Sequence, residues 1–355
     1  MALSRTQLAK AGFTDLSEAL VQLETVCTLT GADAELILEA IHNSADPDRG
    51  LAWLLRLAQS AGIVVPLMKL LKDSAATTRL LAVLGGSKGL AEFIERQPHT
   101  LAFFSQEPGL PGDQEKLRAS LLKSVGAQNG FAKLGGDAAR DALRIHYREL
   151  LLKIAMWDLC HEEPLEQIEW VTGSLSDIAG GALEGALAIA RTEVSENFSK
   201  EDVALVDLAI IGMGKCGARE LNYLSDVDVI YVGASLDEEK MPTDKALTIA
   251  TRLAQHTARA IWDVSKEPGL WEVDANLRPE GKDGALVRTL ESHLAYYDRW
   301  AKDWEFQALL KARPIAGSKE LGEQYVASVA PKVWSSASRS NFVEQVQRMR
   351  ERVTE

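Results

Sequence analysis

Two aspartates separated by one residue, Asp226 and Asp228, begin the alternating segment DVDVIYV. Successive side chains of a β-strand point to opposite faces, so the two carboxylates share one face while Val227 and Val229 point into the core. Carboxylates that close repel each other unless a cation lies between them, and Mg²⁺ prefers such hard oxygen ligands. The pair therefore predicts a metal site, with a solvated strand end as the alternative.

A third acid, Asp274, lies in the later apolar segment WEVDANL, which is predicted to be a strand. If that strand neighbours the first, three carboxylates can hold two metal ions about 3.5 to 4 Å apart. Such a pair of ions activates a nucleophile and stabilises a leaving oxygen in phosphoryl chemistry. We therefore expect Asp226, Asp228 and Asp274 to converge on one site.

A glycine-rich turn precedes the aspartate pair. The buried-strand segment LVDLAIIGMG ends in Gly212 and Gly214, Gly217 follows it, and Lys215 adds a positive charge. Small residues let backbone N–H groups approach a phosphate closely at the start of a helix. The P-loop pattern GxxxxGK[ST] is absent. A glycine turn shortly before a DxD strand predicts a site for a phosphate-bearing ligand and metal ions.

The spacing of apolar residues, which indicates the secondary structure that positions these side chains, changes along the chain. Apolar residues recur every three or four positions up to about residue 200, which predicts helices, including two long ones between Asp137 and about Val194. Beyond about residue 203 the pattern predicts strands and helices in alternation. In chain order we expect a strand in LVDLAIIGMG, one or two helical turns in ARELNYL, a strand in DVDVIYV, an amphipathic helix over 243–263, a strand over 271–277, a continuation of the sheet in ALVR, and helices from Thr289, including WEFQALLKAR.

Composition limits the class of function. The formal net charge of -12 argues against a general nucleic-acid binder, because such affinity comes from Lys and Arg neutralising phosphates. No segment offers the roughly 18 or more uncharged apolar residues that a membrane span needs. Cys27, Cys160 and Cys216 are odd in number and lack metal-ligand spacing, which predicts free thiols in a reducing compartment. We expect a cytoplasmic protein that binds neither nucleic acid nor membrane.

The order of a glycine turn, a short helix, a DxD strand and a later acid resembles the DNA polymerase beta nucleotidyltransferase superfamily. More closely, GMGKCGARELNYLSDVDVIYV, VDANLRPEGKDGALV and WEFQALLKAR resemble glutamine synthetase adenylyltransferase/adenylyl-removing enzymes. The resemblance extends upstream through LLAVLGGSKGLAEFI and covers nearly the whole chain. That family carries the motif twice, and ELNYLSDVDVI, placed after a long helical region, resembles the first, adenylyl-removing copy.

The resemblance implies an α+β fold, with a polymerase-beta-like nucleotidyltransferase core on a small mixed sheet flanked by extensive helical segments. We expect a helical region over 1–200, the core over 201–303, and the start of a C-terminal helical region over 304–355. The last residues, VQRMRERVTE, are predicted to be helical and uncapped, which suggests a truncated chain. The Gly-Gly segment and the Arg-Glu-aliphatic-Glu segment that normally follow the removing half are absent here.

The activity implied is phosphorolysis of adenylyl-tyrosine on glutamine synthetase, which yields ADP, with Mg²⁺ as the cofactor. Implied partners are adenylylated glutamine synthetase, inorganic phosphate, an adenine nucleotide and, further, a PII-type signalling protein. Asp226, Asp228 and Asp274 would be the catalytic metal ligands. The nucleotide or phosphate would contact five residues: Gly214, Lys215, Gly217, Ser225 and Arg278.

Alternatives stay open. Ser225 and Arg278 can each serve a local turn instead of a ligand. Cys216 and Ala218 depart from the usual family pattern but do not touch the acids. The opposite reaction, ATP-dependent adenylylation of the same tyrosine, uses the same kind of metal site. A regulatory module that only binds glutamine synthetase is a third reading, which three clustered acids disfavour.

Overall fold

The helical pattern of the N-terminal part of the chain forms helices, as predicted, in the computed structural model, which describes residues 4–42, 44–107, 109, 112–336, 344 and 347. Two compact units divide the chain: unit 1 is Met1–Pro111 with Arg148–Val171, and unit 2 is Gly112–Tyr147 with Thr172–Glu355. The division falls inside two helices, α10 (Gly136–Cys160) and α11 (Ile168–Val194), and the short helix η2 (Pro164–Gln167) lies between them. These are the two long helices predicted between Asp137 and about Val194. The helix expected over residues 346–355 lies outside the described residues, apart from residue 347.

Aspartate side chains begin several helices of unit 1. Asp15, Asp33, Asp46 and Asp73 each accept a hydrogen bond from a backbone N–H of the first turn, an interaction that contributes about 1 kcal/mol per helix. Four of the aspartates that make the chain acidic are therefore helix N-caps. The elements of this unit are α1 (Arg5–Lys10), α2 (Leu16–Thr30), α3 (Ala34–Ile41), α4 (Pro47–Gln59), α5 (Val64–Leu70), α6 (Ser74–Gly86), α7 (Lys88–Arg96), η1 (Pro98–Thr100) and α8 (Leu101–Phe104).

Unit 2 contains one mixed sheet, in the order β3-β2-β1-β5, with β4 also paired to β2. The central strand β1 runs antiparallel to β2 and β5, while β2 runs parallel to β3 and β4. The predicted α+β class with a small mixed sheet is confirmed. The strands are β1 (Val206–Gly212), β2 (Val227–Ser235), β3 (Val273–Asp274), β4 (Val287–Arg288) and β5 (Arg313–Gly317).

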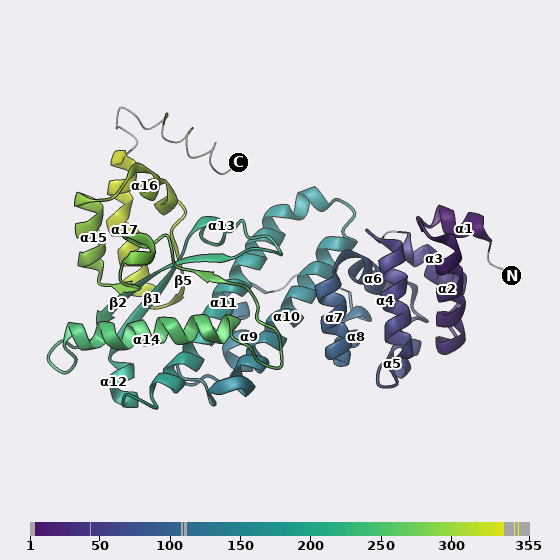
Figure 1. Cartoon of the computed structure of the whole chain (residues 1–355), viewed down its shortest axis with the longest axis horizontal. Coiled ribbons are helices and arrows are strands. Elements are labelled where there is room, and N and C mark those ends of the chain that lie inside the picture. The colour runs from purple at the N-terminus through teal and green to yellow at the C-terminus, as the bar shows by residue number, and fades with distance from the viewer. Residues whose placement is uncertain are drawn as a thin grey trace. The chain divides into compact units, whose positions relative to one another are not determined.

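Helices cover both faces of this sheet. Ile230 and Val232 of β2 pack in an apolar cluster with Tyr297, Phe306 and Tyr325 from the C-terminal helices. The opposite face carries α14 (Thr243–Trp262), which contacts β1 to β4. Figure 1 shows α14 on one side of the strands and α15 to α17 on the other. The remaining elements are α9 (Gln114–Ser124), α12 (Lys200–Ala204), α13 (Gly214–Gly217), η3 (Gly281–Asp283), α15 (Leu290–Arg299), α16 (Asp303–Leu309) and α17 (Lys319–Ser336).

Three local predictions need correction. The helical turn lies on GKCG and not on ARELNYL, because Arg219 adopts a left-handed φ of 64° that ends the helix. The strand predicted over 271–277 is paired only at Val273–Asp274, since Asp274 Oδ1 accepts the N–H of Asn276 at 2.6 Å and turns the chain. The helix of WEFQALLKAR ends at Leu309, and the unpredicted strand β5 follows.

A buried arginine ties the segment before the sheet to the end of α14. Arg144 is fully buried, and its guanidinium donates to the carbonyls of Ala260 at 3.0 Å and Glu267 at 2.9 Å. Nearby, Trp271 Nε1 donates to the hydroxyl of Tyr147 at 3.2 Å. These contacts fix both ends of the loop that leads from α14 into β3.

Two sequence-level expectations concern the whole described chain. None of the helices among the described residues combines the length and apolarity needed to cross a bilayer. Cys27, Cys160 and Cys216 are free thiols, as predicted. The boundaries predicted near residues 200 and 303 stay a prediction. They separate the helical regions from the predicted core, whereas the two compact units are defined by contacts.

Candidate active site

Three carboxylates meet at the start of β2. Val227 pairs with Val273 and Asp228 with Asp274 in the parallel β2–β3 ladder, so the prediction that Asp274 lies on a neighbouring strand is confirmed. One ligand oxygen from each of Asp226, Asp228 and Asp274 lies within 4.8 Å of the others. Asp226 is exposed and the other two are half-buried. Oxygens at this separation can share a metal ion.

The negative charges of the cluster disfavour the ionised form of Asp228. Burial raises the pKa of Asp228, and the negative charges of Asp226 and Asp274 raise it further, while nearby Lys215 opposes the shift. The ionised form of Asp228 is therefore costly in the metal-free protein. A divalent cation would remove that cost, and an all-oxygen donor set of three carboxylates fits Mg²⁺.

The glycine turn packs directly against the acids. Gly214 has a left-handed φ of 51°, and a β-carbon there would lie 2.4 Å from Oδ2 of Asp228. The N–H of Met213 donates to the carbonyl of Asp228 at 2.9 Å. At Gly217 a β-carbon would lie 2.0 Å from the carbonyl oxygen of Lys311. Both glycines are therefore required for the turn to reach the acids and to pack on the segment before β5.

Comparison with known proteins identifies the family of this chain. A protein-family model described as glutamate-ammonia ligase adenylyltransferase matches residues 77–328. The chain belongs to this family. The matched range includes the glycine turn and all three acids of the cluster.

Curated relatives of the glutamate-ammonia ligase adenylyltransferase family align along nearly the whole chain. A protein of Leifsonia xyli subsp. xyli is 52% identical over 99% of this chain and 35% of its own length. Similar proteins of Streptomyces avermitilis and Cutibacterium acnes are 44% and 39% identical, over 33% and 35% of their lengths. All three are named bifunctional glutamine synthetase adenylyltransferase/adenylyl-removing enzyme. The chain spans about a third of the length of these relatives.

The other predicted ligand-binding residues of this family member divide into two groups. Gly214, Gly217 and the exposed Lys215 lie in the turn beside the acids. Ser225 is adjacent to them, with its hydroxyl 3.4 Å from Oδ1 of Asp226. Arg278 differs, because its guanidinium donates to backbone carbonyls of its own loop. These contacts favour the turn-holding alternative for Arg278.

The contacts of Arg278 are specific. Nε donates to Gly284 O at 3.1 Å, Nη1 to Ala275 O at 2.8 Å and Nη2 to Lys282 O at 3.0 Å. Ala275 directly follows Asp274, so this fan of hydrogen bonds holds the loop that begins at the third acid. Its effect on the site is through that loop.

Sequence reasoning missed a set of residues that contact the glycine turn and the residue that ends it. Arg313 donates to the carbonyls of Gly217 and Cys216, both at 3.0 Å. Asp177, buried in α11, accepts from Arg219 at 2.8 Å and lies 4.0 Å from Arg313. Burial raises the pKa of Asp177, against the opposing charges of the two arginines. A lone aspartate in the apolar run GSLSDIAGGAL was the only signal for it in the sequence.

Proposed function

We propose that this chain removes AMP from the adenylylated tyrosine of glutamine synthetase by phosphorolysis, with inorganic phosphate as the second substrate and ADP as product. The observation that carries the proposal is the convergence of Asp226, Asp228 and Asp274 within 4.8 Å beside the glycine turn, in a chain of this family. A site without chemistry would gain nothing from three carboxylates that repel one another.

In the proposed reaction a phosphate oxygen attacks the phosphorus of the AMP group and the bond from phosphorus to the tyrosine oxygen breaks. The proton of the attacking hydrogen phosphate passes to the tyrosine oxygen, so the products are ADP and free tyrosine. Magnesium bound by the three carboxylates would supply positive charge to the oxygens on which negative charge accumulates.

The protein's own groups orient the reactants. Asp274 accepts from its own loop at one oxygen and is our candidate to orient the attacking phosphate and to help remove its proton. Lys215 is an exposed cation near the acids and would pair with a phosphate oxygen of the adenylyl group. The absence of a side chain at Gly214 lets the backbone of the turn lie against Asp228. Ser225 would complete the contacts beside Asp226.

Two features support the removing direction. The motif ELNYLSDVDVI resembles the first of the two family copies, and it follows a long helical region. The names of the relatives combine removal with adenylylation, and this chain covers about a third of the length of those relatives. ATP-dependent adenylylation is therefore the second candidate.

The deciding experiment incubates the chain with adenylylated glutamine synthetase, phosphate and Mg²⁺, and identifies the nucleotide released. Phosphate-dependent ADP, absent with Asp226→Asn, is the expected result. Transfer of AMP from ATP to unmodified glutamine synthetase with release of pyrophosphate would show the opposite reaction. Binding of glutamine synthetase without either product would show a regulatory module.

A further inference from the structure

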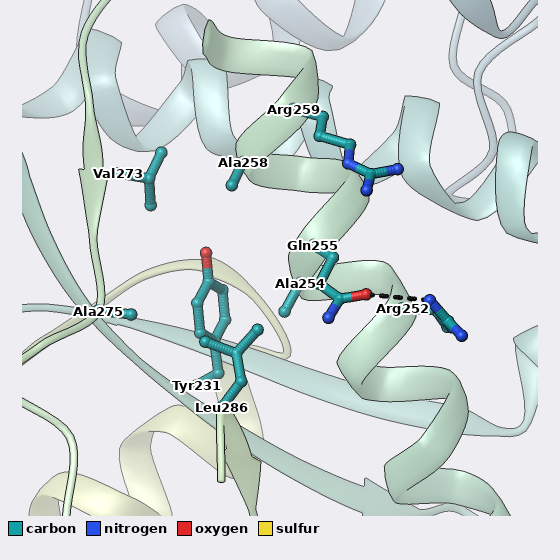
Figure 2. A pocket seen from close by; sticks show the side chains of 9 residues that line it. All are labelled: Tyr231, Arg252, Ala254, Gln255, Ala258, Arg259, Val273, Ala275 and Leu286. Carbon is teal, nitrogen blue, oxygen red and sulfur yellow. Dashed lines mark hydrogen bonds between the residues drawn. The ribbon is translucent and has the colours of Figure 1, made fainter. Parts of the chain in front are cut away.

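A groove in unit 2 lies between α14 and the segment that carries β3. Its volume is about 390 Å³, within the range of small-molecule sites. The floor and one wall are Tyr231 of β2 with Ala254 and Ala258 of α14. The facing wall consists of Val273, Ala275 and Leu286 (Figure 2).

The rim of this groove is cationic in an acidic protein. Arg252, Gln255 and Arg259 recur every three or four residues along α14 and line the groove. Such spacing places side chains on one face of a helix. Among the described residues neither Arg252 nor Arg259 forms an ion pair, and Arg252 donates to one side chain, at Gln255 Oε1, over 3.4 Å. Two unpaired guanidinium groups at one groove favour an anionic occupant.

A buried polar atom points into the same space. Tyr231 is 2% exposed, and among the described residues its hydroxyl has no hydrogen-bond partner. Figure 2 shows this hydroxyl pointing between Val273 of β3 and Ala258 of α14. Buried hydroxyls normally have partners, so an unpartnered one at a groove is a donor available to a ligand.

The groove and the acids occupy opposite faces of the sheet. Asp228 has the same strand parity as Ile230 and Val232, which pack towards α15 to α17, whereas Tyr231 points to the α14 side. Likewise Val273 lines the groove while the adjacent Asp274 joins the acid cluster. A ligand in the groove would therefore be separate from the metal site and would touch the strand that carries its third acid.

We propose that this groove binds a small organic anion, whose carboxylate or phosphate pairs with Arg252 and Arg259 and whose apolar body lies against Val273 and Leu286. The Tyr231 hydroxyl donates to an oxygen of the same molecule. The proposal goes beyond the reaction at the acids and does not depend on it.

The test is isothermal titration calorimetry of the whole chain with EDTA present, which keeps metal-bound ligands out of the measurement. The probes are butyrate, glutarate and glycerol phosphate, each at up to about 10 mM, where even a millimolar site is filled. Binding of a carboxylate or of the phosphate ester supports the site and identifies which anion it takes. No binding by any of the three overturns the proposal.

Variants locate the binding. Arg252→Gln/Arg259→Gln should weaken it at least tenfold, as expected for lost charge-assisted hydrogen bonds. Arg299→Gln/Lys123→Gln removes the same charge at two exposed positions of unit 2 and should leave the affinity unchanged. Equal loss in both double variants would mean nonspecific attraction and would overturn the site.

Two further variants separate the groove from the rest of the protein. Tyr231→Phe removes an unpartnered hydroxyl, so the variant should fold normally and bind about three- to tenfold more weakly. Asp226→Asn should bind the anion like the wild type. Unchanged affinity in the folded Tyr231→Phe variant, or lost affinity in Asp226→Asn, would contradict this location whether or not the chain removes AMP.

Discussion

A β-carbon at Gly214 would stand 2.4 Å from Oδ2 of Asp228, so the turn and the acid strand are built around the absence of one methyl group. Gly214→Ala should displace the Asp228 carboxylate and strain the left-handed backbone at 51°. We expect Mg²⁺ and nucleotide affinity to fall about tenfold or more, which corresponds to about 1.4 kcal/mol, as measured by calorimetry.

The matched control for Gly214→Ala is Gly89→Ala in α7, where a β-carbon meets nothing within 4 Å. It should leave both affinities intact. Unchanged metal affinity in a folded Gly214→Ala variant would mean that Asp228 is not held by this contact.

Asp226→Asn should abolish turnover without unfolding the chain, because it removes one of three converging ligands together with a repulsive charge. The melting temperature without metal should stay the same or rise. Glu239→Gln, at an exposed acid outside the cluster, serves as the control and should keep full activity. Near wild-type turnover by Asp226→Asn would refute the metal assignment.

Asp228→Asn should stabilise the metal-free protein in a pH-dependent way. Burial in the folded state raises the pKa of Asp228 above its ordinary value of 3.8. Ionisation of Asp228 therefore destabilises the folded wild type as the pH rises from 3.8 through this raised pKa. The gain in melting temperature should be full near neutral pH and should vanish below about pH 3.8. A gain that is the same at every pH would rule out this origin.

Without metal we expect Asp228→Asn to have the higher melting temperature, and with Mg²⁺ we expect the wild type to have it. Mg²⁺ should raise the melting temperature of the wild type, because ligands that bind only the folded state stabilise it. It should raise that of Asp228→Asn much less. An equal rise in both would place the ion elsewhere.

Arg278→Ala should act through the loop after Asp274. Losing three hydrogen bonds to carbonyls should cost about 1–3 kcal/mol of unfolding free energy. Arg278→Lys should not restore it, since one ammonium cannot replace a planar fork with three acceptors. Full stability of Arg278→Ala, with only the apparent phosphate affinity reduced, would instead support direct phosphate contact.

The sequence predicted the parts of the site that follow from strand alternation and composition. The parity of Asp226 and Asp228, the neighbouring position of Asp274 and the amphipathic α14 are visible in local patterns and agree with the structure. The site roles of these residues stay predictions.

What escaped prediction depends on contacts between distant segments. The strand β5 has the sequence RPIAG, in which Pro and Gly weaken any strand signal, and it forms because β1 has a free edge for it. Asp177 and Arg313 support the glycine turn from positions 136 residues apart in number, and no local pattern relates them. The groove beside Tyr231 likewise arises only when α14 packs on the sheet.

The buried guanidinium of Arg144 has a practical consequence for anyone who wishes to graft this nucleotidyltransferase core onto another protein. A recombinant piece that starts at residue 201 would omit the donor that satisfies the carbonyls of Ala260 and Glu267, and also the Tyr147 partner of Trp271. The strands β1 and β2 would still pair, but the loop into β3 would lose the contacts that hold it. Asp274, which lies at the end of that loop, would no longer be held in position. A piece that keeps residues 112–147 would carry its own scaffold for the third acid.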